Sequence, residues 1–148
     1  MYEFHGWVNI VADDSDEPES SVLQARRKDL IAALEDRTQA LRSPFLFVQI
    51  VRDLNGAAHL LISGCRNHRD DRVLDLFRWI AEHQPCSYGL LHVRDDEDAQ
   101  GNDNAFVVHI MKRGGLSSSI EGNLSPCIPE LEQGHQTRSA TTRWLTND

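Results

Sequence analysis

The stretch FLFVQIVRDLNGAAHLLISGC, residues 45–65, contains two apolar runs separated by Asn55-Gly56. Asn-Gly is favoured in two-residue hairpin turns because a type I′ turn needs positive φ at both central positions. Both runs are short and rich in Leu, Ile, Val or Phe, as expected of strands with a buried face. We therefore expect an antiparallel hairpin made of residues 45–53 and 57–65.

An amphipathic helix is predicted on each side of this hairpin. The first is expected to start at an Asp16 N-cap, with Pro18 and Glu19 in its first turn, and to end near Leu41. The second is expected to start at Asp70 or Asp71 and to end near His83; its apolar stripe is Val73, Leu74, Phe77, Ile80 and Ala81. Since each helix has one apolar stripe, both should pack on the same face of one sheet.

Three further strands are predicted, at residues 2–12, 86–94 and 104–112. This order of elements predicts an α+β fold: a five-stranded antiparallel sheet with two helices on one face. It is a ferredoxin-like β-α-β-β-α-β layout plus an extra strand, in the spatial order 5-4-1-3-2. The strand pattern ends at Gly114. We expect one domain over residues 1–132 and a polar C-terminal tail over 133–148.

The overall composition is that of an ordinary globular domain, with 148 residues of which 40% are hydrophobic. No apolar stretch is long enough to span a bilayer, and the first residues do not resemble a secretory signal. The odd, widely spaced Cys65, Cys86 and Cys127 predict reduced, mostly buried thiols rather than disulfides or a zinc site. We therefore expect a cytoplasmic protein.

The net charge of −8 argues against the basic surface of a nucleic-acid-binding protein. Acidic residues are concentrated in segments 1–20 and 95–103. Three interpretations are open: solubilising loops, a docking surface for a basic partner, or a calcium loop at 95–98. The last is disfavoured because EF-hand spacing is absent.

Chemistry-bearing residues gather on the face of the sheet that the helices should leave open. Alternation from each predicted strand places there His5, Trp7, Asn9, His59, Leu61, Ser63, Tyr88, Leu90, His92, Arg94, Val107, His109 and Met111. Converging histidines would favour a small ligand- or metal-binding domain or an enzyme. No short-range ligand pair supports a metal site, and no catalytic or phosphate-binding motif is present, so we expect no catalytic residue, metal or cofactor.

Trp7 has two possible roles on this face. A large amphipathic ring is an effective interface anchor. Alternatively, the chain after Gly114 covers it. A third possibility for the whole face is that it packs inside a larger assembly.

Two motifs, MYEFHGW at 1–7 and LSPCIPELE at 124–132, resemble the immunity protein 7 family of bacterial polymorphic and contact-dependent toxin systems. The resemblance covers about residues 1–132. It implies a cytoplasmic antitoxin that binds and neutralises a cognate toxin domain, and it implies no catalytic residues.

The acidic segments suggest how such a protein would bind. Many toxin domains attack nucleic acid and carry basic clefts, which an acidic loop can fill. In the predicted topology Asp70 and Asp71 lie at the same end of the sheet as loop 95–103. We therefore predict a stoichiometric complex with a basic toxin domain, with no nucleic acid or membrane as partner. The predicted partner-binding residues are Asp95, Asp96, Glu97, Asp98, Asp70, Asp71, Trp7 and His92.

Overall fold

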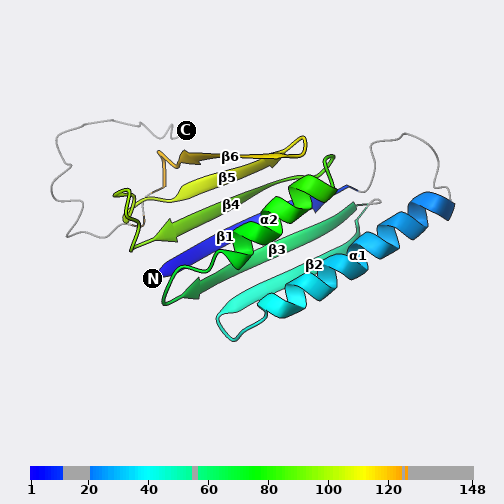
Figure 1. The fold of residues 1–148 in the computed structure, drawn as a ribbon, viewed down its shortest axis with the longest axis horizontal. Coiled ribbons are helices and arrows are strands. Elements are labelled where there is room, and N and C mark those ends of the chain that lie inside the picture. Colours follow the sequence, from blue (N-terminus) through cyan, green and yellow to red (C-terminus); the bar gives the residue numbers. More distant parts are fainter. Residues whose placement is uncertain (12–20, 55–56, 125, 127–148) are drawn as a thin grey trace, which may run out of the picture.

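A computed structural model describes residues 1–11, 21–54, 57–124 and 126. They form a six-stranded antiparallel sheet in the order β2-β3-β1-β4-β5-β6, with two helices on one face (Figure 1). The elements are β1 (Tyr2–Ile10), α1 (Ser21–Leu41), β2 (Leu46–Leu54), β3 (Ala57–Arg66), α2 (Arg72–His83), β4 (Tyr88–Asp95), β5 (Val107–Lys112) and β6 (Gly115–Ile120). The predicted cap at Asp16, the Asn55-Gly56 turn and the tail 133–148 lie outside the described residues.

The core lies between the sheet and the helices. From β1, Phe4, Val8 and Ile10 are buried beneath them, and α2 contributes Val73, Leu76, Phe77, Ile80 and Ala81. Helix α2 lies over the middle of the sheet, roughly along the strands, and α1 lies along β2 (Figure 1). The α+β class and the placement of both helices on one face are confirmed.

The predicted five-stranded sheet is wrong because β6 is missing from it. Read from the other edge, the expected order 5-4-1-3-2 gives the observed order of the first five strands, and β6 adds a new edge beside β5. Arg113 and Gly114, both with positive φ (53° and 75°), form the tight turn between β5 and β6. The sequence GLSSSI of β6 lacks the apolar alternation that identifies a strand, which explains the omission.

The predicted facing of the fifth strand is also wrong. Val107 pairs with Val93 and His109 with Leu91, and directly paired residues project to the same face. His109 and Met111 therefore lie on the helix-covered face, while Val108 and Ile110 lie on the open face. The run FVVHIM is apolar at both alternating sets of positions, so its sequence does not decide between them.

The expectation of mostly buried thiols fails at Cys65, which is exposed, while Cys86 is half-buried. Cys65 pairs with Glu3, which places both side chains on the open face near the end of the sheet. Cys127 lies outside the described residues.

Candidate partner-binding surfaces

The acidic residues singled out above meet at one end of the sheet, which we call the acidic end: Asp70, Asp71, Asp95, Asp96, Glu97 and Asp98. Asp70 and Asp71 immediately precede α2, Asp95 is the last residue of β4, and the others follow it. His68, just before α2, contacts Glu97 in the segment after β4, with Nδ1 3.4 Å from Oε2. The topology therefore brings the two segments together as expected.

Much of the charge at the acidic end is already paired within the protein. The Asp70 carboxylate lies 2.7 Å from both Arg66 Nε and Arg72 Nη2, and only 10% of its side chain is exposed. The hydrogen bond from Arg72 is the largest cause that lowers the pKa of Asp70. Asp71 pairs with Arg69, and the amino group of Met1 contacts Asp96 and lowers the pKa of that carboxyl.

The loop that carries Asp95 to Asp98 is ordered by its own carboxylates. Asp95 Oδ1 accepts a hydrogen bond from the amide of Glu97 (3.1 Å), and Asp98 Oδ2 accepts two from Asn102. The backbone hydrogen bond from Asn102 is the main reason why the pKa of Asp98 is lowered. Beneath the loop, the buried Arg94 donates from Nε to the carbonyl of Asp103.

The other candidate region is the open face, where four apolar side chains form a row across neighbouring strands. Pairing aligns Leu61, Trp7, Leu90 and Ile110. Trp7 is 40% exposed, so no described part of the chain covers it fully. In particular β6, the described strand beyond Gly114, lies at the sheet edge rather than over the ring.

The histidines do not converge as a ligand or metal site would require. His5 and His92 are register neighbours, but His109 lies on the opposite face and His59 pairs with Asn9. Both ring nitrogens of His5 are engaged, with Ser63 Oγ and Glu3 Oε1 at 2.8 Å. The His92 ring lies edge-on to Phe106, with centroids 6.3 Å apart. Within the described ranges, no three His, Cys, Asp or Glu residues are grouped so that they could hold a metal ion.

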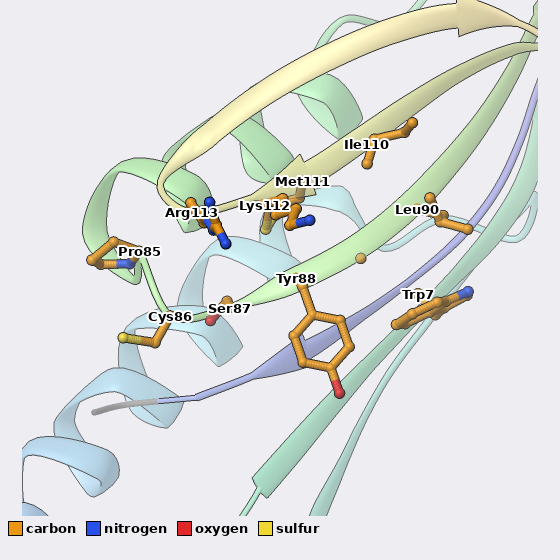
Figure 2. A pocket seen from close by; sticks show the side chains of 11 residues that line it. Trp7, Pro85, Cys86, Ser87, Tyr88, Leu90, Ile110, Met111, Lys112 and Arg113 are labelled. Carbon is orange, nitrogen blue, oxygen red and sulfur yellow. The ribbon is translucent and has the colours of Figure 1, made fainter. Parts of the chain in front are cut away.

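A groove of about 730 Å³ opens at the end of the open face away from the acidic end (Figure 2). Its apolar wall is Trp7, Tyr88, Leu90 and Ile110, and Lys112 and Arg113 lie at the β5–β6 turn beside it. Of these, only Trp7 was predicted as a site residue. Tyr88 and Leu90 were expected on the open face, but Ile110 was missed because of the incorrect facing of strand five.

The fold and these surfaces define a small α+β domain with exposed features suited to protein contacts. The chain matches the family described as immunity protein 7 over residues 1–133 and belongs to that family. It is thus an immunity protein, and this class of protein implies a cognate toxin as partner.

No curated protein matches this chain. A solved structure of a phage SAM lyase in complex with S-methyl-5'-thioadenosine is similar over 82% of this chain and 92% of that chain. The identity is 14% and the TM-score 0.30, which is too low to support any argument. Neither described helix is long and apolar enough to cross a membrane.

Proposed function

We propose that this chain is a cytoplasmic immunity protein that neutralises a toxin domain by binding it in a 1:1 complex, without catalysis or a cofactor. The observation that carries the proposal is the family match over residues 1–133. A stoichiometric inhibitor needs only a complementary surface, so this role assigns no catalytic residue.

The proposed docking region is the acidic end, and the proposed partner is a basic domain such as a nuclease. Asp96 and Glu97 are exposed, and the hydrogen bonds of Asp95 and Asp98 hold the loop in shape. The Asp71–Arg69 pair is 58% exposed on both sides, and such pairs contribute little to folding. A toxin arginine can therefore take over such a carboxylate at low cost.

The basic test is co-expression with the C-terminal domain encoded by the gene immediately upstream. We expect that domain to arrest growth alone, growth to recover when this chain is present, and the two proteins to co-purify in a 1:1 ratio by light scattering. Growth arrest that persists, with no complex recovered, would overturn the proposal.

The role of the acidic end is tested by association kinetics of the variant Asp95→Asn, Asp96→Asn and Asp98→Asn. A control with Asp29→Asn, Asp36→Asn and Glu82→Gln changes net charge equally, but on exposed positions of the two helices. We expect the first variant alone to associate at least about tenfold more slowly and with weaker salt dependence, since steering by local charge is screened over about 8–10 Å. Equal rates for both variants would show that the acidic loop only adds net charge.

A further inference from the structure

The groove at the Tyr88 end of β4 combines three features: an apolar wall, partly exposed aromatic rings, and two cations that form no ion pair with a described residue. Figure 2 shows Trp7, Tyr88 and Leu90 on neighbouring strands, with Lys112 and Arg113 near the β5–β6 turn. Pro85, Cys86 and Ser87, which connect α2 to β4, line its remaining side.

The two rings are held in place although both are substantially exposed. Tyr88 is 47% exposed, and its hydroxyl accepts a hydrogen bond from Asn9 Nδ2 at 2.6 Å. Its ring lies edge-on to Trp7, with centroids 6.0 Å apart. Anchored Trp and Tyr side chains are the residues that most often dominate binding energy, because they bury a large area and lose little conformational freedom.

The charge beside the groove is positive, and no described carboxylate pairs with it. Lys112 and Arg113 are exposed, and neither forms an ion pair with a described residue. By contrast, Arg66, Arg69 and Arg72 at the other end all pair with Asp70 or Asp71. In a chain of net charge −8, two adjacent cations that pair with no described carboxylate are complementary to an acidic group on a partner.

We infer that the groove binds a segment of the toxin domain that carries an apolar side chain next to a carboxylate; this inference rests on the proposed function. The apolar side chain packs on Trp7, Leu90 and Ile110. The carboxylate lies between Lys112 and Arg113.

One toxin domain can reach both ends of the sheet. Strand β4 runs from the groove at Tyr88 to the acidic end at Asp95, and its eight residues span about 25 Å. A standard interface buries about 800 Å² on each partner, which is a patch about 30 Å across. The toxin surface is then basic on one side and apolar with an acidic residue on the other, so the two ends also fix its orientation.

The test measures binding of the co-purified upstream-encoded toxin domain to two groove variants. Trp7→Ala removes the central ring. The double variant Lys112→Gln, Arg113→Asn removes the cations, and Asn tolerates the positive φ at 113 better than most residues. The controls are Phe47→Ala, which removes an exposed apolar side chain of β2 outside the groove, and the double variant Lys28→Gln, Arg42→Gln, which removes two exposed cations at α1. Urea melts establish that each variant folds.

We expect Trp7→Ala to raise Kd by about 30-fold or more, as for a hot-spot residue. The groove double variant should raise Kd by about tenfold, mainly through faster dissociation, while both controls stay within about threefold. Should Trp7→Ala fail to fold, the groove double variant, which changes only exposed side chains, decides alone.

The outcomes separate the two proposals. Wild-type protein that fails to bind the toxin domain overturns the proposed function, and this inference with it. Wild-type binding that the groove variants leave unchanged overturns this inference alone. This inference is also overturned if a groove variant changes only the monomer–dimer equilibrium of this chain and not its binding of the toxin domain. In that case a second copy of the chain occupies the groove.

Discussion

The acidic end and the groove make opposite use of charge. At the acidic end, carboxylates are abundant, but Asp70, Asp71 and Asp96 each already contact a cation of the same chain. The charged side chains that line the groove are Lys112 and Arg113, and neither pairs with any residue in the described ranges. The comparison shows that the number of charged residues in a segment of sequence does not give the charge that is free to bind a partner. At the acidic end several carboxylates are already paired within the chain, whereas Lys112 and Arg113 form no ion pair with a residue that the structure describes.

The largest expected effect concerns the floor of the groove. A Cβ at Gly89 would lie 2.3 Å from the carbonyl oxygen of Trp7 and 2.8 Å from the Cα of Val8. Both are backbone atoms, so Gly89→Ala must push β1 and β4 apart. We expect a loss of about 3 kcal/mol or more in the free energy of unfolding, measured by urea melts.

Gly122→Ala is the matched control, because nothing lies within 4 Å of a Cβ there. Similar stabilities for the two variants would contradict the expected clash between a side chain at position 89 and the backbone of β1.

The next effect tests whether the acidic end contributes to stability. Asp70→Asn weakens the ion pairs with Arg66 and Arg72 at a site where the carboxylate is 10% exposed. We expect a loss of about 1–3 kcal/mol at pH 7. Asp71→Asn, at the exposed Arg69 pair, should cost less than about 1 kcal/mol. Equal losses would contradict the distinction between the largely covered carboxylate of Asp70 and the exposed one of Asp71.

The pH dependence of Asp70→Asn follows from the lowered pKa of this carboxyl. Its stabilising contribution is present above its unfolded pKa of about 3.9 and is lost as pH falls through the folded value. Urea melts between pH 7 and pH 3 should therefore show a smaller acid loss in Asp70→Asn than in wild type.

A smaller effect is expected at His109, the histidine on the helix-covered face. Burial is the main cause that lowers its pKa, followed by the charges of Arg78 and Arg69. The unfolded chain then binds a proton more readily than the folded chain. Titration of His109 therefore leaves the free energy of unfolding unchanged above about pH 6.5 and lowers it as the pH falls below that value. Urea melts from pH 7.5 to 5 should show this slope in wild type but not in His109→Gln. His68→Gln, which removes an exposed histidine, should keep it.

The smallest effect is predicted for the double variant Lys112→Gln, Arg113→Asn in the absence of any partner. Both cations are exposed and pair with no described residue, and such side chains contribute little to folding, so the free energy of unfolding should stay within about 0.5 kcal/mol of wild type. A loss above about 1 kcal/mol in the same melts would show that these cations are structural, like Arg66 and Arg72.

Sequence patterns predicted the parts of the fold where apolar residues have a clear period. The strand at 2–10 alternates between buried and more exposed positions, and α2 has a single stripe, so both were placed correctly. The Ser-rich β6 and the apolar strand β5 lack such a signal. Their placement depends on hydrogen bonds with neighbours, not on their own composition.

For the candidate surfaces, too, the sequence predicted only part of what the structure shows. The sequence indicated that Asp70 and Asp71 share an end with loop 95–98, because topology decides this. It did not indicate which carboxylates are paired, although the spacing of Arg66 and Asp70, four residues apart, was a usable signal. The groove depends on the register of three strands, and one of those was assigned the wrong face.

The position of β1 at the centre of the sheet has a consequence for how the protein assembles during synthesis. Strands β2 and β3 form one local hairpin, and β4, β5 and β6 form a local meander. Within the described sheet, β1 is the strand that pairs with both groups, with β3 on one side and β4 on the other. β1 emerges from the ribosome before either neighbour, and it can join β4 only after residues 88–95 have been made. Such distant pairings form late and slowly. Since Trp7 comes from β1 and Ile110 from the later meander, the groove exists only on a chain whose two halves have already been joined.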